Sequence, residues 1–270
     1  MKAAGLEYSL VLTADLDHGE SEAIAACEAG AIPVVISGDG LIGRVGGALA
    51  GRDVPLGLIA GGRGNDFARV LGIPTAPAAA VAVLSAGHER TIDVGYANRA
   101  HFLCIASCGF DSEANRIANQ VGLVRGPLVY AYAALRALKQ WKPARFTVTT
   151  DGGEPVSFDG YSVVVGNSKA YGGGMFVAPA ALLDDAELDV VITRDGSKLS
   201  FLRGLPAVFK GKHIDRDDVE MWRGGEVLVE ADRSFDVYAD GELITTLPAR
   251  IGLLAASLRV IAPPGPDRGP

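Results

Sequence analysis

The chain has 270 residues, of which 49% are hydrophobic and 21% charged, and its formal net charge is −7. A chain of this size and composition can fold around one large core or two ordinary ones. Its apolar runs, such as 128–135, are far shorter than the ~20 residues that cross a bilayer, and Glu7 and Asp15 interrupt the apolar N-terminal stretch. We therefore expect a cytoplasmic protein without a membrane span or a signal peptide.

Short apolar runs alternate with helix-like segments over the first third of the chain. The pattern predicts strands at 6–13, 32–37 and 54–60 and helices at 21–29, 41–49 and 65–71. This order is typical of a parallel sheet covered by helices, with nucleotide sites at the carboxyl ends of the strands. We therefore predict an α/β nucleotide-binding domain over residues 1–88, built on a parallel sheet with glycine-rich turns.

A different pattern follows residue 88, because several strands there alternate apolar and polar residues. Strands are predicted at 91–97, 101–108, 145–150, 156–166, 188–193, 226–231, 235–239 and 257–262, and helices at 112–140 and 197–210. This alternation predicts a second, mostly antiparallel domain over 89–262. The proline-rich tail at 263–270 is expected to be flexible.

Two of the three cysteines, Cys104 and Cys108, fall in the predicted strand at 101–108. Residues four apart on one strand lie roughly 13 Å from each other, so these two cannot form a disulfide with each other. A metal site built from His101 and both thiols stays open, but no CxxC or HxxxH spacing accompanies them, and the pattern favours buried thiols. The chain also lacks the G-x-S-x-G and H-E-x-x-H motifs, which argues against a serine hydrolase or a zinc protease.

Two glycine-rich turns follow neighbouring predicted strands, and each begins a predicted helix. The first, at 38–43, formally matches the G-x-G-x-x-G dinucleotide fingerprint, but the next strand ends in I-A-G-G at 59–62, without a carboxylate for a ribose. A second glycine turn, at 61–66, follows instead. Two sets of free N–H groups around one crevice favour a chain of phosphates, which predicts a nucleotide triphosphate site. The alternative is that both are tight turns without a ligand.

These turns resemble those of the diacylglycerol and sphingosine-type lipid kinases, whose catalytic domain carries G-G-D-G-T and P-x-G-T-G-N-D-x-A-R turns. Here they read S-G-D-G-L at 37–41 and A-G-G-R-G-N-D-F-A-R at 60–69. Further segments resemble family motifs in the same order: I-D-V-G at 92–95, G-F-D at 109–111, N-S-K-A-Y-G-G-G-M at 167–175, L-D-D-A-E-L-D at 183–189 and D-G-E at 240–242. The likeness covers nearly all of residues 5–262. Bacterial diacylglycerol kinases look most similar, because they share the F-K-G-x-H run at 209–213.

The resemblance implies an α/β nucleotide domain followed by a β-sandwich that shapes a lipid site, with the active site in the cleft between them. It implies transfer of the ATP γ-phosphate to the hydroxyl of diacylglycerol, which gives phosphatidic acid. The residues that it assigns to ATP contact are Thr13, Gly38, Asp39, Gly40, Leu41, Ile42, Gly43, Arg44, Gly62, Arg63, Gly64, Asn65 and Asp66.

The resemblance also implies the catalytic groups. Phosphoryl transfer needs a cation and positioned amides to neutralise the triphosphate, and a carboxylate near the attacking hydroxyl. By this likeness Asp39 holds Mg²⁺ through water, and Asp240, with Glu242 beside it, accepts the proton of the lipid hydroxyl. The alternative for the D-G-E segment is an ordinary hairpin turn.

The acidic turn at 182–189 resembles the metal loop of the family. This implies a second, structural Mg²⁺, held by Asp185 with the backbone carbonyls of Leu182 and Glu187, since hard oxygen ligands suit that ion. Because Ala186 stands where the family has glycine, a solvated acidic turn is the alternative.

The chain departs from the family pattern in and around the glycine turns as well. Leu41, Arg44 and Arg63 replace the residues usual there, and the family's first strand with its N-P-x-S-G turn has no counterpart. The two arginines place cations near the phosphates, where they bind them or alter the nucleotide geometry. A kinase for another lipid alcohol, such as a sphingoid base, and a catalytically silent nucleotide- or lipid-binding relative therefore stay open. An NAD-kinase-like enzyme is disfavoured because its N-E segment is missing.

Two stretches of the chain are basic despite its negative net charge. Residues 114–150 hold six basic residues and residues 197–213 hold four, and neither stretch holds an acid. Cations interleaved with apolar residues are typical of helices that lie on a bilayer. We therefore expect peripheral contact with an anionic membrane surface, the alternative being core-packing helices with solvated outer faces. We expect no nucleic-acid partner, and a homodimer stays open.

Overall fold

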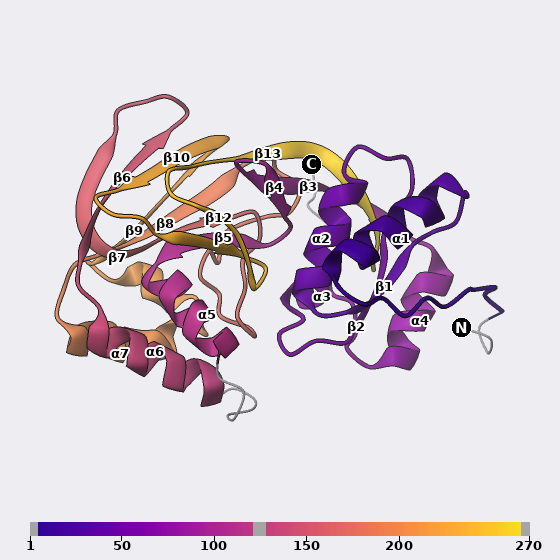
Figure 1. Cartoon of the computed structure of the whole chain (residues 1–270), viewed down its shortest axis with the longest axis horizontal. Coiled ribbons are helices and arrows are strands. Elements are labelled where there is room, and N and C mark those ends of the chain that lie inside the picture. The colour runs from indigo at the N-terminus through magenta and orange to yellow at the C-terminus, as the bar shows by residue number, and fades with distance from the viewer. Residues whose placement is uncertain (1–4, 121–127, 266–270) are drawn as a thin grey trace.

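The structure, a computed structural model, describes residues 5–120 and 128–265. Its N-terminal domain, indigo to purple in Figure 1, holds α1 (Leu16–Glu28), β1 (Val34–Ser37), α2 (Asp39–Leu49), β2 (Gly57–Ala60), α3 (Asp66–Val70) and α4 (Pro77–Ala86). β1 and β2 pair in parallel, with Val34 opposite Gly57 and Ser37 opposite Ala60. Three of the four residues of β2 are buried, as expected of a strand covered on both faces. The predicted strands at 32–37 and 54–60 are thus confirmed in shorter form.

The predicted strand at 6–13 is wrong, because this segment is irregular. Its apolar side chains are exposed, Tyr8 at 51%, Leu10 at 68% and Leu12 at 85%. Within the described residues the parallel sheet holds two strands, β1 and β2. No further strand offers 6–13 the hydrogen-bonding groups that an extended backbone needs.

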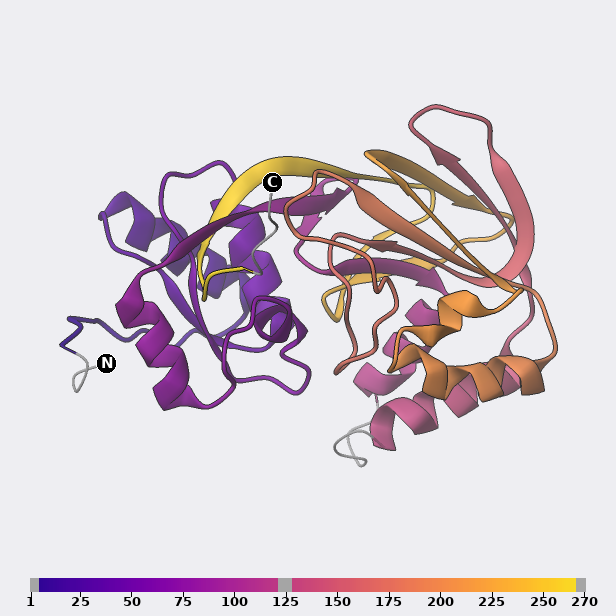
Figure 2. The same ribbon diagram turned by 180° about the vertical axis from the view of Figure 1, so that it is seen from behind.

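The second domain holds β3 (Glu89–Ala97), β4 (Ala100–Phe102), β5 (Ile105–Gly109), β6 (Ala144–Thr150), β7 (Val156–Gly166), β8 (Leu188–Arg194), β9 (Val219–Gly224), β10 (Glu226–Ala231), β11 (Asp236–Ala239), β12 (Glu242–Thr246) and β13 (Ala249–Ile261). All pairs among them are antiparallel. The main path runs β12-β11-β5-β7-β6-β10-β13-β3-β4, and β8 joins it through β7. The sheet folds over on itself (Figure 2). The core that it encloses includes Phe146, Val163, Val190 and Val229. The predicted antiparallel domain is confirmed.

Three helices gather at one end of this sandwich (Figures 1 and 2). They are α5 (Phe110–Gln120), α6 (Leu128–Gln140) and α7 (Lys198–Val208), and the short 3-10 helix η2 (Lys212–Asp215) follows α7. The helical stretch predicted at 112–140 holds α5 and α6, and its middle part, 121–127, lies outside the described residues. The helix predicted at 197–210 is confirmed as α7.

The strand predicted at 101–108 breaks into β4 and β5. Leu103 and Cys104 lie between the two strands, and their backbone N–H groups donate to the carboxylate of Asp240, at 2.7 and 2.9 Å. The break therefore arises because a side chain distant in sequence takes donors that a strand ladder would otherwise use.

The last strand returns to the first domain. β13 bends at an irregularity between Leu254 and Leu258 and runs back to β2, so residues 257–262, which the sequence assigned to the second domain, pack on the first (Figures 1 and 2). There the N–H of Leu56 donates to the carbonyl of Arg259 at 2.8 Å, and the N–H of Ile261 donates to Leu56 at 2.9 Å. Because β3 and β13 pair with each other and both contribute to the core of the first domain, they join the two domains.

The cysteine prediction is confirmed, since Cys104 and Cys108 are buried free thiols. Burial raises the pKa of both thiols, so they stay protonated and inert. Among the helices that the structure describes, none is long and apolar enough to cross a membrane.

Candidate active site

The two glycine-rich turns touch each other at the carboxyl ends of β1 and β2. The N–H of Gly61 donates to the carbonyl of Ser37 at 2.8 Å. Gly62 lies against Gly38 so closely that a Cβ added at Gly62 would stand 2.3 Å from the Cα of Gly38. Only glycine permits this approach. The contact brings the second turn to the N-terminus of α2, where free N–H groups favour an anion.

Asn65 and Asp39 fix the shape of the second turn. Asn65 has a left-handed φ of 54°, its Oδ1 accepts from the N–H of Gly62 at 2.8 Å, and its Nδ2 donates to the carbonyl of Gly62 at 3.0 Å. Asp39 is the first residue of α2, and its Oδ1 accepts from the N–H of Phe67 at 3.1 Å. The side chain of Asp39 therefore ties the start of α2 to α3.

Asp39 and Asp66 form an acid pair behind these turns. A Cβ added at Gly64 would lie 2.9 Å from Asp66 Oδ2 and 3.1 Å from Asp39 Oδ2. Asp66 is buried, its Oδ2 accepts from the N–H of Gly173 at 2.7 Å, and its Oδ1 has no hydrogen-bond partner. Burial, and to a smaller extent Asp39, raises the pKa of Asp66, whereas the bond from Gly173 lowers it. A buried carboxylate oxygen without a partner beside a second carboxylate fits Mg²⁺, which usually binds one or two carboxylates together with substrate phosphates.

Asp240 lies in the turn between β11 and β12. Asp240 and Gly241 both have positive φ, 52° and 91°, as in a two-residue type I′ hairpin turn. The N–H groups of Leu103, Cys104 and Ile105 donate to its carboxylate at 2.7, 2.9 and 3.4 Å. Burial nevertheless raises the pKa of Asp240 to about 7, because its effect exceeds that of the three bonds, which lower it. A carboxylate offers about four acceptor sites, so a further proton donor can still reach this one.

Helix α2 approaches this turn through two glycines. A Cβ added at Gly43 would lie 2.7 Å from Asp240 Oδ2, and one added at Gly40 would lie 2.7 Å from Glu242 Oε1. Partial burial raises the pKa of Glu242, and the negative charge of Asp39 contributes to the raised pKa of Asp240. The structure thus brings the three predicted catalytic carboxylates, Asp39, Asp240 and Glu242, together at the N-terminal part of α2, where the two domains meet.

Three residues that the sequence assigned to ATP contact have other surroundings. Thr13 is exposed in the irregular segment before α1. Leu41 packs on α1, where a Cβ added at Gly19 would lie 2.5 Å from its Cδ1. Ile42 is fully buried in the core. The side chains of Leu41 and Ile42 therefore hold α2 in place.

The two arginines that distinguish this chain differ in their partners. The guanidinium of Arg44 lies 2.7 Å from Asp17 and also pairs with Glu20, so carboxylates of α1 already engage it. Arg63 is exposed between the glycines of the second turn. Of the two cations, Arg63 has the position from which a side chain can reach bound phosphates.

An apolar cavity of about 130 Å³ lies in the second domain, against α5, α6 and α7. The apolar residues of its wall include Phe110, Val164, Val191, Phe201, Leu205 and Val208. Its polar lining residues include Asp111, Tyr171, His213 and the ion pair formed by Arg216 and Asp218. Burial raises the pKa of Asp111 to about 6, against the lowering effect of hydrogen bonds with Ser162 and Tyr171.

One loop borders both the cavity and the acid pair. Tyr171 and Met175 line the cavity, and the same two residues exchange backbone hydrogen bonds at 3.1 and 3.0 Å. Gly173, at the tip of this loop, donates to Asp66. The cavity and the cleft therefore lie on two sides of the loop at 171–175.

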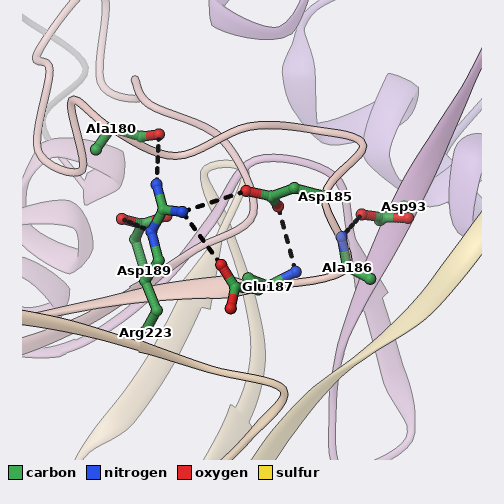
Figure 3. A network of polar contacts seen from close by, with 7 residues as sticks. All are labelled: Asp93, Ala180, Asp185, Ala186, Glu187, Asp189 and Arg223. Atoms are coloured by element: carbon green, nitrogen blue, oxygen red, sulfur yellow. Dashed lines mark hydrogen bonds and ion pairs between the residues drawn. The ribbon is translucent and has the colours of Figure 1, made fainter. Parts of the chain in front are cut away.

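The acidic turn at 182–189 is tied to β9 by Arg223 (Figure 3). The guanidinium of Arg223 lies 3.3 Å from Asp189 Oδ1 and 3.1 Å from Glu187 Oε2, and it donates to the carbonyl of Ala180 at 3.1 Å. Asp185 Oδ1 accepts from the N–H of Glu187 at 3.2 Å. Asp185 Oδ2 is buried, accepts no hydrogen bond and lies 3.6 Å from Arg223.

Asp185 Oδ2 accepts no hydrogen bond, and the cation beside it is the guanidinium of Arg223. In the part of the chain that the structure describes, no three His, Cys, Asp or Glu side chains are grouped to hold a metal. Further ligands would have to be backbone carbonyls, as predicted for Leu182 and Glu187. Ala186 takes up the left-handed φ of 59° that the family's glycine would adopt easily.

Two buried residues to which the sequence assigned no role join the parts of the site. Asp93 accepts from the N–H groups of Ala186 at 2.8 Å and of Ala256 at 2.7 Å. Asn167 donates to the carbonyls of Asp93 at 3.0 Å and of Leu103 at 2.8 Å. The sequence feature that could have identified Asp93 and Asn167 is their position in the I-D-V-G and N-x-x-x-Y-G-G-G segments. Both side chains are buried, and a buried polar side chain needs hydrogen-bond partners.

Comparison with known proteins gives matches over nearly the whole chain. Residues 1–97 match the diacylglycerol kinase catalytic domain, and residues 104–262 match the YegS C-terminal NAD kinase beta sandwich-like domain. A diacylglycerol kinase of Mycobacterium tuberculosis is 34% identical, over 97% of this chain and 87% of that protein. A protein of Pseudomonas fluorescens named probable lipid kinase YegS-like is 31% identical, over 97% and 88%.

Comparison with solved structures gives a similar fold. The crystal structure of a diacylglycerol kinase from Bacillus anthracis superposes with a TM-score of 0.74 at 22% identity, covering 97% of this chain and 88% of that one. Both domains and the order in which they follow each other are therefore shared. The chain belongs to the bacterial diacylglycerol kinase and YegS-like lipid kinase family.

Proposed function

We propose that the protein is an ATP-dependent kinase that transfers the γ-phosphate to the hydroxyl of diacylglycerol and forms phosphatidic acid. One observation carries the proposal: the loop at 171–175 contacts Asp66 of the cleft through Gly173 and lines the apolar cavity with Tyr171 and Met175. A site suited to phosphates and a site suited to acyl chains thus adjoin one loop. Relatives named diacylglycerol kinase and lipid kinase support the same reaction class.

The cleft supplies the nucleotide half of the reaction. Free N–H groups at the start of α2 and in the second glycine turn bind phosphate oxygens. Asp39 and Asp66 hold the cation that accompanies ATP. Bound Mg²⁺ neutralises charge on the phosphates during transfer.

The turn at 240–242 supplies the base. The lipid hydroxyl oxygen attacks the γ-phosphorus, the bond from phosphorus to the β,γ-bridging oxygen breaks, and ADP leaves. Asp240 takes the hydroxyl proton, with Glu242 as a second carboxylate beside it. A base whose pKa is about 7 combines a populated basic form with a useful proton affinity at neutral pH.

Turnover on a panel of lipid alcohols tests this function. Diacylglycerol, monoacylglycerol and sphingosine, each in neutral detergent micelles, are offered with ATP and Mg²⁺, and the phosphorylated lipids are separated by thin-layer chromatography. We expect phosphatidic acid from diacylglycerol, formed at least about 10²-fold more slowly by the Asp240→Asn variant. Absence of product from every lipid alcohol would overturn the proposal.

Asp111 favours a second candidate, a kinase for a sphingoid base. Its carboxyl lines the apolar cavity, and with a pKa of about 6 it is mostly ionised at neutral pH. A carboxylate in apolar surroundings gains from a cationic partner, and the ammonium of a sphingoid base is one. In the same panel, product from sphingosine that disappears in Asp111→Asn, while diacylglycerol gives none, would favour this candidate.

We also propose a structural Mg²⁺ at the acidic turn, held by Asp185 and by the carbonyls of Leu182 and Glu187. The buried Oδ2 of Asp185, which accepts no hydrogen bond, supports it. For the cellular setting we propose a cytoplasmic enzyme in peripheral contact with an anionic bilayer, because its substrate resides there. Whether it acts as a homodimer is tested by light scattering on the purified protein.

A further inference from the structure

Helix α7 covers the cavity without being buried itself. Ser197 caps the helix, because its Oγ accepts from the N–H of Ser200 at 3.1 Å, and no residue of α7 is buried. Its inner face lines the cavity with Phe201, Gly204, Leu205 and Val208. Helix α7 therefore lies between the cavity and the surroundings of the protein.

The outer face of α7 combines cations with exposed apolar groups. Leu199, Arg203, Pro206 and Lys210 recur at the spacing of one helix face, and all four are exposed. Leu199 is 55% exposed, and Phe209, directly after the helix, is 54% exposed. Water is a poor environment for the exposed apolar side chains, whereas the boundary of a bilayer suits apolar side chains and cations together.

Helix α6 continues this surface. Lys198 Nζ donates to the carbonyl of Lys139 at 3.2 Å, and both views show α6 and α7 at the same end of the sandwich (Figures 1 and 2). Leu135 is 53% exposed and Tyr132 is 44% exposed, and Lys139 is exposed beside them. Two helices therefore present apolar and basic side chains together.

The charge of this end contrasts with that of the whole chain. The chain carries −7, yet residues 128–142 and 197–213 contain basic residues and no acid. The acids that flank the second segment, Asp195 and Asp215, lie beyond its ends. Each Lys or Arg near an anionic bilayer contributes attraction that salt weakens.

We propose that the α6–α7 surface, formed by Leu135, Lys139, Leu199, Arg203, Phe209 and Lys210, docks on an anionic lipid bilayer. The proposal rests on the proposed function in that the cavity behind α7 takes a lipid. Docking places the outer face of α7 against the headgroups while its inner face lines the lipid site. A lipid then reaches the cavity across one helix, without passing through water.

Vesicle flotation with the full chain tests the surface. The vesicles are phosphatidylcholine, with or without phosphatidylglycerol, in low salt and high salt. We expect the parent to float with phosphatidylglycerol vesicles, less so in high salt, and not with phosphatidylcholine alone. Arg203→Glu with Lys210→Glu should lower the bound fraction relative to the free fraction at least about tenfold.

A matched control reverses two charges elsewhere. Arg52→Glu with Arg99→Glu makes the same change in net charge after α2 and in the β3–β4 turn, far from α7 in both views. Its flotation should fall much less. A second variant, Leu199→Ser with Phe209→Ser, removes the apolar part and should also weaken flotation, which keeps the test open if the charge variant fails to fold.

Equal flotation of the parent and both α6–α7 variants, or equal losses in the control, would overturn the proposal. Turnover on micellar lipid separates this outcome from a failure of the proposed function. A parent that phosphorylates micellar lipid but does not float refutes the surface alone. A parent that floats through α7 but phosphorylates no lipid refutes the proposed function alone.

Discussion

The backbone N–H of Leu103 donates a 2.7 Å hydrogen bond to Asp240, which lies 137 residues further along the chain. This hydrogen bond helps to explain both the break between β4 and β5 and the position of the Asp240 carboxylate. Without the carboxylate, the amides between β4 and β5 would lack acceptors, and without the amides, a buried carboxylate would lack donors. The predicted base is therefore held by backbone groups, which no side-chain substitution can remove.

The raised pKa of Asp240 predicts a pH dependence of turnover. With a pKa of about 7, the base is protonated in acid, so kcat/KM should rise with pH and level off above about pH 7. Asp240→Asn should lower kcat roughly 10²–10⁴-fold and remove this rise. Rates on micellar diacylglycerol across pH test both points. A variant within about threefold of the parent would contradict the role of base.

The same carboxyl predicts a pH dependence of stability. Its pKa lies above the ordinary 3.8, so between these values the folded state binds more protons than the unfolded state. By linkage, the free energy of unfolding should fall as pH rises from about 4 to about 7, and this contribution should be constant above that range. Urea unfolding of the parent and of Asp240→Asn across this range measures it. Parallel slopes for the two proteins would show that Asp240 does not titrate as expected.

Gly62 is predicted to tolerate no side chain. A Cβ there would stand 2.3 Å from the Cα of Gly38. Because Gly38 meets it with backbone, the clash cannot be relieved by the rotation of a flexible side chain. Gly62→Ala should therefore destabilise the fold by roughly 1–3 kcal/mol and weaken ATP binding. Gly225→Ala is the control, because its nearest neighbour, Asp151 Oδ1, lies at an ordinary 3.5 Å. Chemical unfolding and calorimetric titration with ATP measure the two effects, and equal behaviour of both variants would contradict the contact.

Local chemistry explains what the sequence predicted well. Glycine turns that follow buried strands depend on local backbone conformations, which glycine itself indicates, so the two turns at 38–43 and 61–66 could be predicted at the ends of β1 and β2. The D-G-E segment proved to be both a hairpin turn and the holder of a buried carboxylate, so its two interpretations were compatible.

Long-range pairing explains what the sequence predicted badly. The segment at 6–13 has the alternation of apolar and polar residues that is typical of a strand. A strand also needs a neighbouring strand to pair with, and among the described residues 6–13 has none, so the segment is irregular. The strand at 101–108 breaks because Asp240 takes its amides. Arg44 forms an ion pair with Asp17 on α1 that the sequence did not predict. Each difference from the sequence prediction depends on a partner that is distant in sequence or, for 6–13, on a neighbouring strand that is absent among the described residues.

Asp66 is predicted to bind ATP through the cation. Its free Oδ1 and the neighbouring Asp39 fit Mg²⁺. Asp66→Asn should weaken the binding of ATP in the presence of Mg²⁺ by several-fold. Without Mg²⁺ the variant should bind ATP no worse than the parent, because it lacks one negative charge near the phosphates. Calorimetric titrations with Mg²⁺ and with EDTA make the comparison, and an equal loss in both would contradict a role in holding the cation.

Asp185 is predicted to stabilise the fold through a second cation. Arg223 is shared among Glu187, Asp189 and Asp185, and the buried Oδ2 of Asp185 lies 3.6 Å from it without a hydrogen bond. A divalent cation bound there stabilises the folded state by mass action, since it does not bind the unfolded chain. Asp185→Ala should therefore lower the Tm more in Mg²⁺ than in EDTA.

The matched control for Asp185 is Glu220→Ala, which removes a carboxylate that pairs with Arg194 between the same two strands, β8 and β9. No free buried oxygen is lost with Glu220, so its small effect on the Tm should be the same in Mg²⁺ and in EDTA. Thermal unfolding of the three proteins without ATP keeps the nucleotide cleft out of the comparison. If Asp185→Ala lost equal Tm in both buffers, Arg223 alone would be the cation of this turn, and the second magnesium would have to be abandoned.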